Sequence, residues 1–362
     1  MKILYVNDEV KGGGAEYILE ILLDYFRKEN EVAIASSSIL YPTDFFLPTI
    51  SKGGLSDNLA IPRDDGPYLA LYRAIKKFKP DLIHFNNILR VTPSVIQIAR
   101  EMNVPFLSTM HGMEHICPET FWVNGHFCEI RERSKCKCLT YQKYHRRLEY
   151  FREVALESPI VVYSENMKKD MVSFGFREKD ITVIPNGINP KEVPGNTGWD
   201  KHIMWTGSEG IKGKELIWGT LGMEKKNFKL HTYSYFPMET LDSYYVANPF
   251  VPKRRFLDDL GNSSGLLYTS FYPYPGLVAL EAMACSKPII AFKNKNQEVL
   301  ELGGTLVTNP DPKEIVKSVE YLIDNEEIGR TMGEINRKAF ETYYTSDIMG
   351  KKYEEIYKKV IG

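Results

Sequence analysis

The chain has 362 residues, of which 43% are hydrophobic and 26% charged, so it can bury more than one core and is too apolar to be disordered. Its formal net charge of -1 argues against the broad basic surface of a nucleic-acid-binding protein. No apolar run approaches the roughly 18 residues of a membrane-spanning helix, and the start MKILYVNDE lacks a signal-peptide pattern. We therefore expect a cytoplasmic protein of two domains.

The first half of the sequence alternates between strand and helix patterns. Ile3–Val6 is a buried-strand run, the glycine turn 12–14 follows it, and apolar residues then recur at helical spacing from Ile18 to Phe26. Further strands are expected at 32–35, 82–85, 106–110, 160–163 and 181–184. This alternation predicts a doubly wound α/β, Rossmann-like domain over residues 1–185 with a parallel sheet.

A stretch dense in proline, glycine and asparagine follows and predicts a linker at 186–200. Beyond it, strands are expected at 202–205, 228–231, 265–268 and 288–292, with helices from 213, at 276–285 and then to the end of the chain. This pattern predicts a second Rossmann-like domain over 201–344, and 345–362 forms an amphipathic helix that must pack on another element. Two open α/β sheets predict a ligand site in an interdomain cleft that faces the carboxyl ends of both sets of strands.

Two glycine loops are candidate phosphate sites. Gly13 and Gly14 permit close approach of the backbone and point a helix start at an anion, although an ordinary tight turn explains them equally well. The later loop 207–214 could place Lys212 or Lys214 on a phosphate. Neither loop matches a dinucleotide or ATP motif, and Glu215 stands where a Walker A loop requires Ser or Thr.

The most specific stretch is 272–291, which reads YPYPGLVALEAMACSKPIIA. Glu281 stands one turn into an otherwise apolar helix, where it is either a helix-dipole partner or a carboxylate that faces a ligand. The pattern Gly-Leu-x-x-x-Glu-Ala-Met-Ala-Cys-x-Lys-Pro-Ile-Ile-Ala resembles the donor-site signature of glycosyltransferase family 4, the large retaining GT-B group. The resemblance continues, in the family's order, through the first glycine loop, Pro80-Asp81, His111 and residues 185–189.

This resemblance implies a GT-B fold and an enzyme that transfers a hexose from a nucleoside-diphosphate sugar to an acceptor hydroxyl with retention of configuration. The donor would be a UDP- or GDP-sugar, the acceptor a glycan, a lipid-linked molecule or a small molecule, and neither a catalytic metal nor another cofactor would be required. The carboxyl-terminal half would hold the nucleotide and the amino-terminal half the acceptor, and the last helix would cross back to the first domain.

The resemblance also implies roles for individual residues. Glu281 would bind the donor ribose, Lys212 would clamp the diphosphate, and His111 would lie beside the donor sugar; His111 and Lys212 are the implied catalytic residues. The backbone at the start of the helix would hold the donor phosphate or sugar. The implied donor-binding set is Gly13, Gly14, Gly207, Ser208, Lys212, Pro275, Gly276, Leu277, Val278 and Glu281.

Two departures from the family pattern bear on donor choice. Pro273 stands where the first glutamate of the usual E-x7-E pair is expected, and Ser208 stands where an arginine is expected. A non-catalytic sugar-nucleotide-binding relative and a GT-B-like sugar-nucleotide epimerase are therefore alternative hypotheses. The sugar itself is not predicted.

Four of the five cysteines fall in a predicted insertion at 112–140: Cys117, Cys128, Cys136 and Cys138. Structural zinc and two disulfides remain the main alternatives for this group, free thiols are a third, and we assign it no catalysis. Cys285 is expected in the core. The basic runs at 76–79 and 141–152 favour solvated helix faces over a weak peripheral contact with the inner membrane face.

Overall fold

The computed structural model describes residues 1–49, 65–114, 116–117, 122–123, 126–128, 135–155, 158–194, 198–207, 210–221, 223, 228–234, 243–249, 251–272, 274–293 and 298–362. The chain divides into two compact units, one made of Met1–Asn186 with Ser346–Gly362 and the other of Gly187–Thr345. Each unit has its own parallel sheet.

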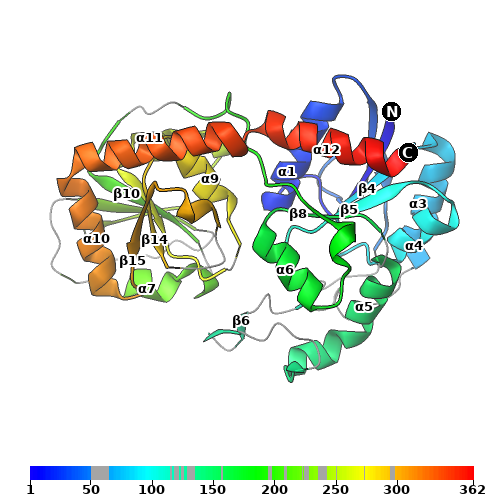
Figure 1. The fold of residues 1–362 in the computed structure, drawn as a ribbon, viewed down its shortest axis with the longest axis horizontal. Coiled ribbons are helices and arrows are strands. Elements are labelled where there is room, and N and C mark those ends of the chain that lie inside the picture. Colours follow the sequence, from blue (N-terminus) through cyan, green and yellow to red (C-terminus); the bar gives the residue numbers. More distant parts are fainter. Residues whose placement is uncertain are drawn as a thin grey trace. The chain divides into compact units, whose positions relative to one another are not determined.

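In the described part of the first unit, seven strands form a parallel sheet in the order β3-β2-β1-β4-β5-β8-β9. Figure 1 labels β4, β5 and β8 of this sheet. The strands are β1 (Lys2–Asn7), β2 (Glu31–Ser36), β3 (Phe45–Phe46), β4 (Leu82–Asn87), β5 (Phe106–Thr109), β8 (Ile160–Val162) and β9 (Ile181–Val183). The helices are α1 (Gly14–Phe26), α3 (Asp65–Phe78), α4 (Ser94–Glu101), α5 (Leu139–Ala155), α6 (Glu165–Ser173), the 3-10 turn η2 (Glu178–Asp180) and α12 (Ser346–Ile361). β6 (Trp122–Val123) and β7 (His126–Phe127) pair with each other in antiparallel orientation.

The second unit repeats this architecture. Its described residues form a parallel six-stranded sheet in the order β12-β11-β10-β13-β14-β15. The strands are β10 (His202–Thr206), β11 (Lys229–Tyr233), β12 (Tyr245–Asn248), β13 (Gly265–Tyr268), β14 (Ile289–Phe292) and β15 (Thr305–Thr308). The helices are η3 (Gly210–Lys212), α7 (Lys214–Trp218), α8 (Lys253–Asn262), α9 (Leu277–Ala284), η4 (Glu298–Glu301), α10 (Pro312–Asp324) and α11 (Glu326–Tyr343).

Apolar patterning explains both sheets. The inner strands β13 and β14 are apolar along their length rather than alternating, because helices cover both faces of a parallel sheet. Leu4 in β1, Ile83 in β4 and Ile290 in β14 are each fully buried. The predicted doubly wound α/β fold class is confirmed.

A chain of buried polar contacts fastens α12 to the first sheet. The hydroxyl of Tyr357 lies 2.9 Å from that of Tyr5 in β1 and 2.6 Å from Nδ1 of His84 in β4. The other ring nitrogen of His84 lies 2.7 Å from Oγ1 of Thr109, which is 3.0 Å from the hydroxyl of Tyr353. Figure 1 shows α12 beside α1, and the two helices are in contact.

The strand orders indicate where each unit can bind a ligand. In the first sheet, the strand order reverses between β1 and β4: β2 and β3 lie on one side of this pair, and the later strands lie on the other. In the second sheet, the order reverses in the same way between β10 and β13. Ligands of open α/β sheets bind at the carboxyl ends of the strands where the order reverses. The residues that follow β1, β4, β10 and β13 are therefore the first to consider.

Candidate functional site

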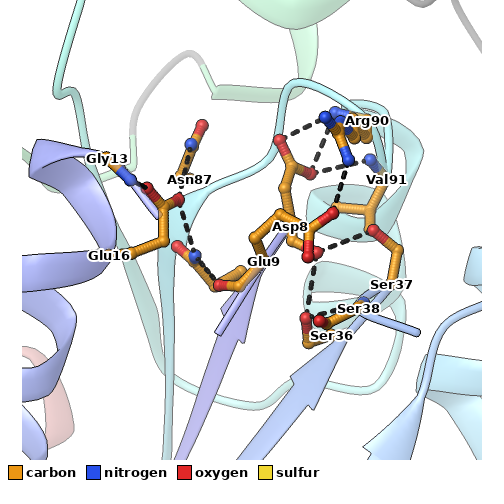
Figure 2. A network of polar contacts seen from close by, with 11 residues as sticks. Asp8, Glu9, Gly13, Glu16, Ser36, Ser37, Ser38, Asn87, Arg90 and Val91 are labelled. Atoms are coloured by element: carbon orange, nitrogen blue, oxygen red, sulfur yellow. Dashed lines mark hydrogen bonds and ion pairs between the residues drawn. The ribbon is translucent and has the colours of Figure 1, made fainter. Parts of the chain in front are cut away.

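The first glycine loop follows β1 and leads into α1. The backbone N–H of Gly13 donates to Oε2 of Glu16 at 2.9 Å, and the side-chain amide of Asn87 donates to Oε1 at 3.4 Å (Figure 2). The side-chain amide of Asn7 also donates to Oε1, at 3.3 Å. Glu16 is buried, so a negative charge of the protein itself already lies at the start of α1. This arrangement changes our expectation for the loop, because Gly13 N–H is used by Glu16 instead of being presented to a ligand. Gly14 is the first residue of the helix.

A second buried carboxylate lies beside the loop. Asp8 accepts hydrogen bonds from the backbone N–H groups of Arg90, at 2.9 Å, and Val91, at 3.0 Å (Figure 2). Burial raises the pKa of Asp8 to about 7, against the lowering effect of these two donors and of the charge on Arg147. Arg147 is itself buried, and desolvation lowers its pKa to about 10. This edge of the first sheet is thus rich in buried charge, which protein interiors tolerate only when it is paired and hydrogen-bonded.

His111 follows β5 and lies at the same edge of the first sheet. Its Nε2 is 2.9 Å from Oδ1 of Asn86 at the end of β4. The amide nitrogen of Asn86 donates to Oδ1 of Asn7 at 2.8 Å and to the carbonyl of Ala15 at 3.2 Å, so the oxygen of Asn86 must be the acceptor toward His111. The proton of His111 is therefore on Nε2, and Nδ1 is the ring acceptor. Burial lowers the pKa of His111 to about 4, which keeps the imidazole neutral at physiological pH.

In the second unit, the loop after β10 is held against the end of β13. Gly207 has a φ of 156° and Gly213 a φ of 78°, and a Cβ on Gly213 would lie 2.6 Å from the carbonyl oxygen of Thr269. Thr269 in turn donates from Oγ1 to the carbonyl of Lys212 at 2.6 Å. Only glycine permits this approach of two backbones. The loop fixes Lys212, whose ammonium lies 5.2 Å from the centre of the Tyr272 ring.

The start of α9 forms the other side of this region. Gly276 is the N-cap of α9, and its N–H donates to the hydroxyl of Tyr268 at 3.0 Å. Glu281, in the second turn, has a side chain that is 4% exposed, and its Oε1 accepts a hydrogen bond from the ammonium of Lys253, the first residue of α8. The second unit thus gathers two lysines, a buried carboxylate and a helix N-terminus around its strand reversal, a composition suited to a phosphorylated ligand with a diol.

Comparison with known proteins agrees with this geometry. The sequence profile of "Glycosyltransferase Family 4" matches residues 12–192, and that of "Glycosyl transferases group 1" matches residues 253–339. The chain belongs to glycosyltransferase family 4. An uncharacterized glycosyltransferase of Methanocaldococcus jannaschii, MJ1178, is 24% identical over 300 residues, which are 76% of this chain and 76% of that protein.

Solved structures show that this family 4 chain has the GT-B fold. Sucrose-phosphate synthase from Thermosynechococcus elongatus is similar with a TM-score of 0.75 at 15% identity, covering 99% of each chain. Anabaena HepE, solved in complex with UDP-glucose, is similar with a TM-score of 0.71 at 14% identity, covering 99% of this chain and 100% of that one. The predicted family and fold are therefore confirmed, and the protein is a glycosyltransferase.

The structure sorts the residues that sequence reasoning assigned to the donor site. Gly207, Lys212, Gly276 and Glu281 follow, or lie just beyond, the two central strands of the second sheet, and Pro275, Leu277 and Val278 flank Gly276 at the start of α9. Gly13, Gly14 and His111 lie at the reversal of the first sheet. Ser208 and Pro273, the two departures from the family pattern, lie outside the described residues. The roles of all these residues remain predictions.

Sequence reasoning missed the partners that position the predicted residues. Lys253 binds Glu281, Asn86 orients His111, and Tyr268 binds the N–H of Gly276. Of these partners, only Asn86 could have been found from its position in the sequence. It lies at the carboxyl end of a buried strand, next to the point where the strand order reverses. The other two contacts depend on tertiary packing.

The cysteine cluster was assigned zinc or two disulfides. The structure forms no disulfide among Cys117, Cys128, Cys136 and Cys138, so it does not contain the expected crosslinks. The metal-ligating groups that come together among the described residues do not include these thiols, so zinc there is not supported. Burial raises the pKa of the Cys136 thiol, and the nearby Cys138 and Cys128 add to this effect while a backbone hydrogen bond with Cys138 opposes it. Cys285 is buried, as expected.

Two further features concern the rest of the molecule. Within the described part of the chain, no helix is both long and apolar enough to cross a membrane. An open cavity of about 710 Å³ lies against residues such as Pro105, Pro159 and Lys179, at the amino ends of β5, β8 and β9. None of the predicted site residues lines this cavity.

Proposed function

We propose that this glycosyltransferase transfers a hexose from a UDP-sugar to an acceptor hydroxyl with retention of configuration, and that the second unit holds the donor. The observation that carries the proposal is the arrangement around the end of β13: Thr269 binds the backbone of Lys212, Tyr268 binds the start of α9, and α9 carries the buried Glu281. GDP remains the second candidate base. UDP is favoured because the similar Anabaena HepE was solved with UDP and with UDP-glucose.

Each of these groups has a distinct task in the proposed reaction. The carboxylate of Glu281 accepts hydrogen bonds from the two ribose hydroxyls, for which a two-oxygen acceptor is well matched. The bond between the anomeric carbon and the phosphate oxygen breaks with its electron pair, so negative charge grows on the leaving diphosphate. The ammonium of Lys212 and the backbone N–H groups of Leu277 and Val278 stabilise that charge.

No protein base is needed in this proposal. The acceptor oxygen attacks the anomeric carbon from the face that the diphosphate leaves, and the departing phosphate oxygen takes the proton of the acceptor. The carbon keeps its configuration, and a neutral hydroxyl becomes a glycosidic oxygen while the diphosphate leaves with the proton. His111 is neutral with Nδ1 as acceptor, so it binds a hydroxyl of the donor sugar and carries no charge into the reaction.

A donor screen tests the proposal directly. We would measure the melting temperature of the purified protein with UDP, GDP, ADP and their sugar conjugates, with and without EDTA, because a ligand of the native state raises the melting temperature by mass action. A rise with UDP compounds that EDTA leaves unchanged is expected. A rise with GDP compounds alone would reassign the base, and no rise with any nucleotide would overturn the donor site.

A pair of variants makes the test specific to the site. Glu281→Ala should lose most nucleotide affinity while remaining folded, whereas Glu334→Ala, which removes an exposed glutamate of α11, should bind as wild type does. Lys212→Met should lower kcat by about 10²-fold, the typical effect of removing one group that stabilises transition-state charge. Wild-type nucleotide affinity in Glu281→Ala would show that this residue does not bind the ribose.

A further inference from the structure

A second polar cluster in the same unit lies away from the donor site. It consists of His202, the first residue of β10, His231 in the middle of β11, and Asp259 on α8. Gly207 follows the other end of β10, five residues and about 16 Å of extended strand from His202. The proposed reaction uses none of these three side chains.

The three side chains converge on one point. Nε2 of His202 lies 3.3 Å from Oδ1 of Asp259, and Nδ1 of His231 lies 3.0 Å from Oδ2. One ligand atom from each residue lies within 4.8 Å of the others. The two imidazole rings stack with centroids 4.1 Å apart and planes inclined by 18°, so their ring nitrogens reach the same carboxylate from adjacent strands.

One of these nitrogens lacks a satisfactory partner. His202 is 6% exposed, and its Nε2 makes no hydrogen bond, since its 3.3 Å approach to Asp259 lacks the required geometry. A buried polar atom without a hydrogen bond destabilises a protein, and native structures contain few of them. The atom faces the carboxylate of Asp259.

We propose that His202, His231 and Asp259 bind a divalent transition-metal ion, best matched by Zn²⁺. Imidazole nitrogens with a carboxylate oxygen suit this class of cation. Zinc ligands lie about 2.1 Å from the ion, so at tetrahedral angles two ligand atoms are about 3.4 Å apart. The two nitrogens lie 3.3 and 3.0 Å from the two different oxygens of Asp259, and one ligand atom from each residue lies within 4.8 Å of the others, so small movements of the side chains would bring three ligand atoms to that spacing. A water molecule would complete the coordination.

The residues around the cluster fit the proposal. The hydroxyl of Tyr233 donates to Oδ2 of Asp259 at 2.8 Å, and hydrogen bonds of this kind orient the carboxylates of metal sites. The ion would crosslink β10, β11 and α8. Because α8 begins at Lys253, the partner of Glu281, the crosslink would fix that helix about 9 Å along its axis from the donor site. The ion is therefore a structural crosslink, separate from the chemistry.

Metal titration of the chelator-treated protein tests the site. Zn²⁺ should raise the melting temperature with a saturable dependence, and Co²⁺ should give visible absorption without the intense near-ultraviolet bands of thiolate ligands, which would instead report binding at the cysteines. Asp259→Asn and His231→Gln should abolish both signals. Tyr233→Phe should weaken binding by about 10–100-fold, as loss of an outer hydrogen bond to a ligand typically does.

The controls separate metal binding from loss of the fold. His145→Gln removes an exposed histidine of the first unit and should leave both signals unchanged. Circular dichroism of the metal-free variants checks that they are folded, and His231, which is partly exposed, is the safer of the two histidines to replace. Absence of metal binding to the wild type, or binding that His231→Gln leaves unchanged, would overturn the proposal.

Discussion

The ammonium of Lys253 donates to the carboxylate of Glu281 and joins the first residue of α8 to the second turn of α9. The two ends of the pair differ, because the side chain of Glu281 is 4% exposed and that of Lys253 is 39% exposed. The lysine can therefore move into solvent while the carboxylate stays in place. A ligand with a diol could take over the carboxylate without leaving a buried cation behind.

This pair predicts a specific pattern of stability. Lys253→Met leaves a buried carboxylate without a cation and should lower the free energy of unfolding by about 1–3 kcal/mol, less than for a fully buried pair because the lysine is partly solvated. Glu281→Gln should lower the free energy of unfolding by less, because it removes the buried charge and leaves only the partly exposed lysine without its partner. Urea unfolding of the two single variants and the double variant checks this. Additive effects would show that the contact contributes no coupling energy.

His111 should act as a neutral group. Its pKa of about 4 lies below the ordinary 6.5, so protonation of this side chain should not reduce kcat/KM until the pH approaches 4. His111→Ala should lower kcat/KM by about 10–100-fold, the effect of one or two lost hydrogen bonds, and leave UDP affinity within about twofold. Initial rates between pH 4.5 and 8, with His145→Ala as the exposed control, test this. A wild-type inflection near pH 6.5 that disappears in His111→Ala would contradict it.

Most inner strands could be predicted from the sequence because each contains a short run of mainly apolar residues. The predicted runs at 3–6, 82–85 and 265–268 correspond to β1, β4 and β13. The edge strands were harder. β12 was not predicted, and 305–308 was assigned to the helical end of the chain but forms β15. Both pair with one neighbour, and most of their residues are only partly buried, so they lack the apolar run that marks an inner strand.

The donor site could be predicted only in part, for a related reason. The glycine turns and the glutamate inside an apolar helix are local features, and the sequence displays them. Lys253 stands 28 residues before Glu281, and nothing in its own segment distinguishes it from the two arginines that follow. The loop at Gly13 is the opposite case, because a local feature was visible but its tertiary contact was not. Its glycines permit an anion site, but in the folded protein the N–H of Gly13 donates to Glu16.

Asp8 should make stability depend on pH in an unusual direction. Its folded pKa of about 7 lies above the ordinary 3.8, so the folded protein binds more protons than the unfolded chain between about pH 4 and pH 7. The contribution of this group is fully present below pH 4 and is lost as the pH rises through 7. This pKa shift contributes at most about 4 kcal/mol to the free energy of unfolding.

The variant Asp8→Asn isolates that contribution. The free energy of unfolding of the wild type should exceed that of Asp8→Asn by more at pH 5 than at pH 8. The reason is that the buried aspartate is protonated at pH 5 and charged at pH 8. Urea unfolding at both pH values measures the difference, and Asp24→Asn, an exposed aspartate of α1, serves as control. A difference that is equal at the two pH values would show that the folded pKa is not raised.

Tyr357 should be the most sensitive hydroxyl of the α12 attachment. It contacts both Tyr5 and His84, so Tyr357→Phe removes the shared partner of two buried polar groups. Leaving buried groups unsatisfied costs about 1–3 kcal/mol each, and we expect a loss of about 2–4 kcal/mol in the free energy of unfolding. Tyr343→Phe, which alters an exposed tyrosine of α11, should change it by less than about 0.5 kcal/mol. If the two substitutions changed the free energy of unfolding equally, these buried polar contacts would not hold α12 on the sheet. The helix would then be held by its apolar face alone.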